Sequence, residues 1–171
     1  MTVLRSHTDG ATRSEALWST CGNYRYRLTR RWDDGPELLY IMLNPSKATE
    51  AQNDPTIERC QRRATALGYA AFTACNLFAL CATDPKDLKA HPAPIGADTD
   101  AELLRAAHQA DEILCAWGVH GTHLNRHMAA ASLLAEFPLT ALGQTKEGHP
   151  RHPLYISYAD KPAPWHPPSP L

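Results

Sequence analysis

Two histidines, an arginine and two prolines lie close together near the end of the chain, in the segment GHPRHPLYI from Gly148 to Ile156. Proline interrupts a helix and removes a donor from a β-ladder, so we expect this segment to form an irregular loop. Loops that a rigid scaffold holds in place often carry binding or catalytic residues. His149 and His152 are therefore candidate functional side chains, and the alternatives for each are a surface imidazole or a metal ligand.

Four apolar stretches predict buried strands, and a polar or glycine-containing segment follows each of them. The stretches are 37–43, 70–77, 112–118 and 138–143. In an open parallel sheet, ligands bind beyond the carboxyl ends of the strands, so we expect the four following loops to meet at one site. Each candidate there also has a local explanation: Asn44 as a turn residue, Asn76 as a partner of nearby backbone, and Trp117 as a core aromatic.

Helical patterns separate these strands. Residues 54–68 favour a helix with Asp54 as its N-cap and Pro55 at the first helical position. Further helices are expected over 98–110 and 123–137. Buried strands that alternate with helices predict a three-layer α/β/α sandwich, an α/β fold with a mostly parallel sheet of about four strands.

The expected organisation places one domain over residues 21–160. Residues 1–20 are polar and weakly patterned, so we expect a flexible lead-in with one short helix at most. Residues 23–32 alternate apolar with charged side chains, which is typical of a half-exposed strand at a sheet edge. The proline-rich tail, residues 161–171, is expected to be extended and partly disordered.

Composition narrows the class of protein. The chain has 171 residues, a formal net charge of −1 and five cysteines. No apolar stretch reaches the roughly 20 residues that a membrane span needs, and the N-terminus lacks the apolar core of a secretory signal, so we expect a cytoplasmic protein with reduced cysteines. The arginine-rich segments 25–31 and 59–63 predict either a phosphate-binding face or a solvated charged surface.

Several short motifs occur in an order that resembles a known family. The motifs MLNPS, DPTI, CNLFAL, TDP, AWGVHG and GQTKEGHPRHPLY, between about Leu38 and Tyr155, are similar to those of the domain-of-unknown-function 1643 family of bacteria and phages. More distantly, MLNPS, FTACN, CAWGVHG and HPRHPL resemble the motifs that end successive strands in the uracil-DNA glycosylase superfamily, such as GQDPY or GINPG, LLLN, LLWGxxA and HPSPLS. This second resemblance implies an enzyme that cleaves the N-glycosidic bond of a DNA base.

The resemblance assigns roles to the residues that match the motifs. It implies that Asn44 positions water or stabilises charge, that Asn76 reads the edge of a flipped base, and that His149 hydrogen-bonds the departing base. Asp54 is an alternative carboxylate for the task of Asn44, and its other explanation is the helix cap. Ser46 stands where GQDPY has its tyrosine, which implies a roomier pocket and a base other than uracil.

The remaining candidates would recognise the flipped nucleotide and its strand, because base flipping requires stacking and phosphate contacts. Stacking on the base is expected from Phe78, Trp117 or Tyr155. Contacts with DNA are expected from Lys146, Arg151, His152 and Leu154, the last as a wedge in the gap that the base leaves.

The resemblance thus implies a DNA glycosylase that removes a modified or damaged base and leaves an abasic site. The occurrence of the family in bacteria and phages extends this to bulky modified pyrimidines of phage DNA, in antiviral defence. DNA with a flipped-out base is the expected partner, and no cofactor, metal, membrane or obligate protein partner is expected. The alternatives are a nucleoside- or nucleotide-processing enzyme such as a deoxyribosyltransferase, a non-catalytic module that binds modified nucleic acid, and a metal-dependent hydrolase that uses His120, His149 and His152.

Overall fold

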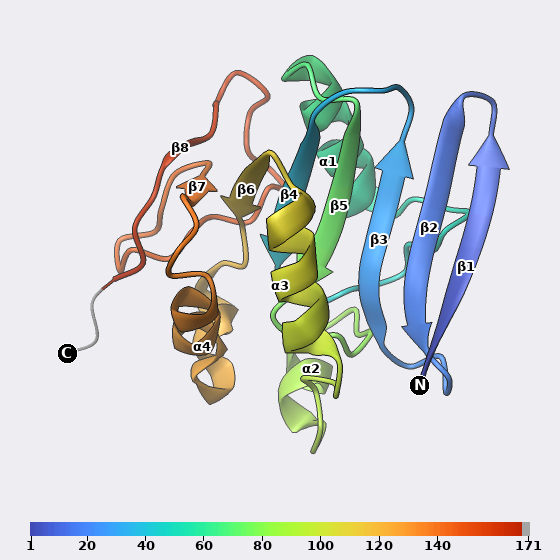
Figure 1. Ribbon diagram of the computed structural model, residues 1–171. Coiled ribbons are helices and arrows are strands. Elements are labelled where there is room, and N and C mark those ends of the chain that lie inside the picture. The colour runs from blue at the N-terminus through green and yellow to red at the C-terminus, as the bar shows by residue number, and fades with distance from the viewer. Residues whose placement is uncertain (169–171) are drawn as a thin grey trace.

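Eight strands form one mixed sheet in the order β1-β2-β3-β5-β4-β6-β7-β8 (Figure 1). The structure is a computed structural model that describes residues 1–168. The strands are β1 (Thr2–Asp9), β2 (Thr12–Ser19), β3 (Arg25–Arg31), β4 (Glu37–Met42), β5 (Ala71–Asn76), β6 (Glu112–Cys115), β7 (Thr140–Ala141) and β8 (Ala163–Pro164). The helices are α1 (Pro55–Ala66), α2 (Pro85–Ala90), α3 (Thr99–Gln109) and α4 (Arg126–Leu133), with the 3-10 segment η1 (Val119–Asn125) before α4.

The predicted three-layer sandwich with a mostly parallel sheet of about four strands is wrong. The sheet has twice that number of strands, and four neighbouring pairs, β1–β2, β2–β3, β3–β5 and β7–β8, are antiparallel. Only β4–β5, β4–β6 and β6–β7 are parallel. The four apolar stretches do form strands, but further strands extend the sheet at both ends, and the outermost of them, β1 and β8, are fully exposed.

The hairpin of β1 and β2 replaces the expected flexible lead-in of residues 1–20. Its two strands pair from Thr2 opposite Ser19 to Asp9 opposite Thr12, and Gly10 adopts φ +58° in the two-residue turn. Such turns need a positive φ, which glycine adopts without steric cost. Both faces of β1 are exposed to solvent, so its sequence has no apolar alternation that would reveal a strand.

Strand β3 lies inside the sheet, between β2 and β5, and not at the predicted edge. Four of its residues are buried, including the charged Arg25 and Arg30, and the other three are half-buried. Arg30 is covered by the loop that precedes α1, because its guanidinium donates to Asn53 Oδ1 at 2.8 Å and to Thr49 O at 2.7 Å. Arg25 and Arg30 therefore face protein carbonyls, whereas Arg27 and Arg31 of the same strand are only half-buried.

The proline-rich tail begins as part of the sheet. Strand β8 pairs with β7, and Trp165 N donates to Leu139 O at 2.9 Å. The indole of Trp165 is buried and meets the ring of Trp117 edge-on, at 5.5 Å between ring centroids. Residues 163–165 are thus anchored by backbone pairing and by an aromatic contact, while residues 169–171 of the predicted tail lie outside the described residues.

Helix α1 begins as predicted from its sequence. Asp54 is the N-cap, its Oδ1 accepts from Ile57 N at 2.9 Å, and Pro55 occupies the first helical position. The apolar side of α1 packs on one face of the sheet through Ile57 and Cys60. Ile57 and Met42 of this side line the cavity described below, together with Leu43 and Trp117 of the opposite side.

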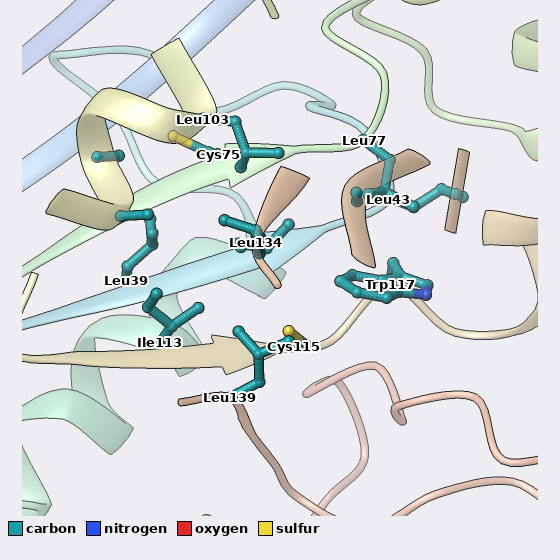
Figure 2. Close-up of a cluster of buried hydrophobic side chains, with 14 of the residues drawn as sticks. Leu39, Leu43, Cys75, Leu77, Leu103, Ile113, Cys115, Trp117, Leu134 and Leu139 are labelled. Carbon is teal, nitrogen blue, oxygen red and sulfur yellow. The ribbon is translucent and has the colours of Figure 1, made fainter. Parts of the chain in front are cut away.

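The second face of the sheet is covered by α3 and α4. Their side chains meet those of β4, β5 and β6 in a single apolar cluster, and Trp117 lies at one end of it (Figure 2). Leu39, Cys75, Leu103, Ile113 and Leu134 are among its members. The cluster fixes α3 and α4 against the parallel strands, and so fixes the strand ends where the site lies.

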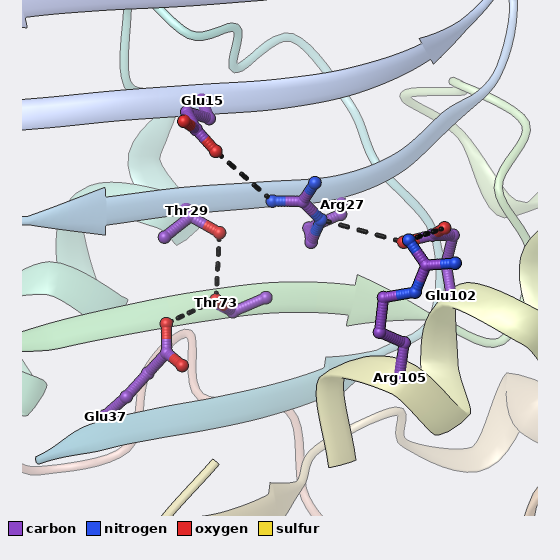
Figure 3. A network of polar contacts seen from close by, with 7 residues as sticks. All are labelled: Glu15, Arg27, Thr29, Glu37, Thr73, Glu102 and Arg105. Carbon is purple, nitrogen blue, oxygen red and sulfur yellow. Dashed lines mark hydrogen bonds and ion pairs between the residues drawn. The ribbon is translucent and has the colours of Figure 1, made fainter. Parts of the chain in front are cut away.

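A polar network joins the hairpin to the rest of the sheet (Figure 3). Arg27 lies between Glu15 of β2 and Glu102 of α3, at 3.6 and 3.7 Å. Beside it, Thr29 and Thr73 share a hydrogen bond of 2.9 Å between their hydroxyls. These contacts span β2, β3, β5 and α3, so the hairpin is held to the core by side chains as well as by the β-ladder.

Candidate active site

A cavity of about 420 Å³ opens at the carboxyl ends of β4, β5 and β6. These three strands are parallel, so the segments that leave them meet at one edge of the sheet. The volume lies in the range of small-molecule sites, about 300–1,000 Å³. Seven of the residues expected from the sequence line its wall: Asn44, Ser46, Asp54, Asn76, Trp117, His152 and Leu154.

Asn44 follows β4 and is fixed by two hydrogen bonds of its amide nitrogen. Nδ2 donates to Pro45 O at 2.9 Å and to Ala82 O at 2.8 Å. Both amide hydrogens are therefore used by the backbone of two loops. The atom of this side chain that is left for the cavity is the acceptor Oδ1, which can orient a water molecule or face a developing positive charge.

Asn76 is the last residue of β5 and is 3% exposed. Neither its Oδ1 nor its Nδ2 has a hydrogen-bond partner among the described residues. An unpaired buried polar group costs about 1–3 kcal/mol, so natural cores rarely contain a whole unpaired amide. Because Asn76 lines the cavity, its donor and its acceptor are available to a ligand there.

The loop after β7 is inserted between the ends of neighbouring strands by backbone hydrogen bonds. Pro150 O accepts from Gly118 N at 2.8 Å, and Arg151 N donates to Gly143 O at 3.1 Å. Pro150 also forms an isolated β-bridge with Gln144, so this segment is extended there, between the segments that follow β6 and β7. His152, immediately after it, lines the cavity.

His152 presents a hydrogen-bond donor to the cavity. Its Nδ1 accepts from Leu154 N at 3.2 Å, so the proton of the neutral ring is on Nε2. Burial lowers the pKa of His152, and the negative charge of Asp54 opposes this to a smaller extent. The side chain is therefore neutral at neutral pH and offers Nε2–H to a ligand.

Replacing His152 by asparagine is expected to make folding less sensitive to acid. The pKa of His152 is lower in the folded protein than its usual value of 6.5, so the unfolded chain binds this proton more tightly. The stability linked to His152 is therefore fully present above about pH 6.5 and is lost as the pH falls through the lowered pKa. Asparagine Oδ1 can accept from Leu154 N as Nδ1 does, but it cannot be protonated in this range.

Thermal unfolding measured between about pH 7 and pH 5 tests this expectation. The exposed His166 provides the matched variant, His166→Asn, which should melt like the wild type across the range. Equal acid sensitivity of the wild type and His152→Asn would contradict the expectation.

Asp54 borders the cavity, but its carboxylate is bonded to the backbone. Oδ1 caps α1, and Oδ2 accepts from Ala48 N at 3.1 Å and from Lys47 N at 3.3 Å. Three N–H groups thus converge on one side chain. This arrangement supports the capping role of Asp54 over that of a catalytic carboxylate, and it holds the 45–54 loop in place at the rim.

His149, expected to hydrogen-bond the departing base, lies outside the cavity. Its ring meets His127 edge-on at 5.8 Å, in a separate void of about 20 Å³ beside Trp117 and Trp165. Side chains alternate between the two sides of an extended segment, so residues three apart lie on opposite sides. Only one histidine of the HPRH sequence can therefore reach the cavity, and it is His152.

Four other expected residues also lie away from the cavity wall. Phe78 is fully buried and packs against His123, at 5.6 Å between ring centroids, so it cannot stack on a base. Tyr155 is 91% exposed. Lys146 and Arg151 are exposed on the same loop, where only a ligand that extends along the surface would reach them.

The arginines of the 59–63 segment, for which the sequence predicts either a phosphate-binding face or a solvated surface, bind mostly to the protein itself. Arg63 is buried and donates to the carbonyls of Ile156, Ser157 and Asp160. Arg59 also bonds Ile156 O, and Arg62 forms an ion pair with Glu58 on the surface of α1. Two of the three arginines therefore attach the C-terminal loop to α1.

The cavity wall also contains Arg25, which the sequence does not place there, and His120, which the sequence suggests only as a metal ligand. Arg25 begins β3, and its position in an alternating charged strand predicts exposure to water. His120 lies in η1, and burial and the charge of Lys89 lower its pKa. A signal for His120 exists in the sequence, since the AWGVHG motif follows a buried strand, but nothing local in the sequence distinguishes Arg25 from its neighbours.

The described residues contain no group of three or more His, Cys, Asp or Glu side chains arranged to hold a metal ion. The three histidines of the metal-dependent alternative do not meet, because His120 and His152 line the cavity while His149 lies in the smaller void.

Within residues 1–168, no helix combines the length and the apolar character that crossing a membrane requires.

A family model described as "Protein of unknown function (DUF1643)" matches residues 25–154. The chain belongs to the DUF1643 family. The matched DUF1643 region begins at Arg25 and ends at Leu154, which are also the first and last residues that line the cavity. The hairpin β1–β2 and strand β8 lie outside it.

Comparisons with curated proteins and with solved structures return no match. The likeness of this DUF1643 protein to the uracil-DNA glycosylase superfamily therefore stays a prediction from its motifs.

Proposed function

We propose that this DUF1643 protein hydrolyses the N-glycosidic bond of a modified or damaged base in DNA, and that the flipped base binds in the cavity. The observation that carries the proposal is the unpaired buried amide of Asn76. An amide offers an acceptor and a donor side by side, which complements the polar edge of a nucleobase. The buried ring of Trp117 in the same wall supplies apolar surface for the base.

Cleavage of this bond builds positive charge on the sugar and negative charge on the leaving base. The C1′–N bond breaks and its electron pair moves to the base, where Nε2–H of His152 can donate to the anion. Water adds to C1′ and its proton passes to solvent. Oδ1 of Asn44 is suited to orient that water and to face the sugar, because its Nδ2 is already bonded to two carbonyls.

A modified base is favoured over uracil by the size of the site. Ser46 lies in the wall of the 420 Å³ cavity, where the resemblance puts the tyrosine that narrows the pocket of uracil-specific enzymes. A small hydroxyl at this position leaves room for a substituent on the ring. A bulky pyrimidine of phage DNA, removed in antiviral defence, is a substrate of this description.

A nucleoside- or nucleotide-processing enzyme is the second candidate. It is favoured by the net charge of −1 and by the buried Arg25 in the cavity, which suits a small anionic ligand as well as a base in a polymer. Salt distinguishes the two, because binding to DNA weakens steeply as salt is added and binding of a small molecule does not.

Base release is expected to depend on His152 and not on His149. Purified protein is incubated with unmodified DNA, uracil-containing DNA and phage DNA that carries hypermodified cytosine or thymine, and abasic sites are counted. We expect release from one modified substrate, reduced about 100-fold in His152→Ala, as for the loss of one positioned proton donor. His149→Ala should retain most of the rate, because His149 faces a different void.

Three results would change the proposal. A greater loss in His149→Ala than in His152→Ala would contradict the assignment of the leaving-group donor. Salt-sensitive binding of modified DNA without release would identify a non-catalytic binding module. Neither release nor salt-sensitive binding would exclude a DNA substrate and leave the nucleotide-processing enzyme.

A further inference from the structure

Four arginines are buried among the described residues, and the guanidinium groups of three of them make several hydrogen bonds each, although Nε of Arg63 has no partner. Arg30 bonds the 49–53 loop, Arg63 bonds the 156–160 loop, and Arg126 donates to Leu77 O at 2.9 Å and to Asp100 Oδ1 at 2.7 Å. Each of these arginines joins segments that are distant in sequence. Their burial is therefore explained by the fold.

Arg25 differs from the other three. It is 2% exposed, and its guanidinium makes one hydrogen bond to the described residues, from Nη1 to Ala48 O at 2.8 Å. Its Nε is buried without a partner. No carboxylate of residues 1–168 forms an ion pair with it, although guanidinium carries five N–H donors and keeps its charge in proteins.

Burial of such a cation is unfavourable unless something compensates it. Removing an ion from water costs several kcal/mol after relaxation, and one carbonyl replaces little of its hydration. Burial lowers the pKa of Arg25, and nearby Asp54 opposes this only by its charge, since the carboxylate of Asp54 is bonded to backbone N–H groups. The fold alone therefore does not account for this residue.

The position of Arg25 in the fold indicates which group could compensate its buried charge. Arg25 N donates to Ala79 O at 2.9 Å, which holds the start of β3 alongside the end of β5. Arg25 and Asn76, two buried side chains with unpaired polar atoms, line the same cavity. A group that enters this cavity would meet a base-recognising amide and an uncompensated cation together.

We propose that Arg25 binds an oxyanion of the ligand, a carboxylate or a phosphate. The planar guanidinium is the side chain whose donors best match the oxygens of these groups. This inference rests on the proposed function and narrows its substrate class to a base that carries an acidic substituent. The same chemistry is present in the 5′-phosphate of a free nucleotide, and the experiment separates the two sources.

Isothermal titration calorimetry with the full-length protein compares two pairs of probes. The first pair is uracil and 5-carboxyuracil, and the second is deoxyuridine and deoxyuridine 5′-monophosphate. We expect the anionic member of one pair to bind roughly tenfold more tightly or better, the contribution of one or two charge-assisted hydrogen bonds. The preference should disappear in Arg25→Gln and persist in Arg62→Gln, which removes the same charge from the surface of α1.

A preference for 5-carboxyuracil that needs Arg25 supports an acidic base, and one for the monophosphate that needs Arg25 supports binding of a nucleotide phosphate. Absence of both preferences in the wild type overturns the inference, even if Arg25→Gln fails to fold. A preference that persists in folded Arg25→Gln, checked by circular dichroism, also overturns it. If DNA releases no base while the Arg25-dependent preference is present, the proposed glycosylase activity fails and the role of Arg25 stands.

Discussion

Replacing Asn76 by leucine is expected to make the protein more stable and to abolish base release. Leucine resembles asparagine in shape, and it removes two buried polar atoms that have no partner, so stability should rise by about 1–3 kcal/mol. The same change leaves the polar edge of a bound base without partners in a dry site. We therefore expect the rate of release to fall by about 1,000-fold or more.

Asn53→Leu is the matched control for this variant. The amide of Asn53 is fully used, since Oδ1 accepts from Arg30 and Nδ2 donates to Glu58 and Gln61. Its loss should lower stability by about 1–3 kcal/mol and leave release unchanged. Urea unfolding and counting of abasic sites measure both effects. If Asn76→Leu lost stability as Asn53→Leu does, Asn76 would be a structural residue and the main support of the proposed function would fail.

The largest expected loss of stability belongs to Arg63→Met. Arg63 is 1% exposed and makes hydrogen bonds of 2.9 to 3.1 Å to three carbonyls of the C-terminal loop. Hydrogen bonds to charged groups contribute about 1.5–3 kcal/mol each, so we expect a total loss of about 3–5 kcal/mol after the methionine repacks. Amide hydrogen exchange in residues 156–160 should increase at the same time, because this loop loses its main attachment to α1.

Arg62→Met tests whether that loss reflects the buried contacts. Arg62 is one position away on the same helix and forms only an exposed ion pair with Glu58, so its replacement should not change stability measurably. Equal destabilisation by the two variants, or unchanged exchange in 156–160, would show that Arg63 does not anchor the loop.

Helix α1 and the buried strands can be predicted from the sequence because the patterns that indicate them lie within each segment. Asp54 before Pro55 predicts a helix start, and the structure has the cap and the proline at those positions. The apolar stretches that contain β4, β5 and β6 predict strands because each must be buried on both faces. The positions of Asn44 and Asn76 at the ends of such strands also mark them as candidate site residues from the sequence alone.

The hairpin β1–β2 could not be predicted in this way. A strand exposed on both faces needs no apolar alternation, and its pairing with β2 is satisfied by backbone groups that every residue carries. The mostly antiparallel character of the sheet follows from these strands and from β3. For this reason the prediction of a mostly parallel sheet is wrong at the outer strands, whereas the central strands β4, β5 and β6 lie in the predicted segments.

The sequence by itself determined which segments must be buried and where polar residues interrupt them. Only the tertiary structure decided that His152 and not His149 faces the cavity, and that Arg25 lies buried beside the end of β5. The physical reason is that burial of an apolar stretch is a property of that stretch, whereas the partner of a polar atom is set by segments far away in the chain. Asn76 and Arg25 are informative because the fold buries their polar atoms and provides them with almost no partners.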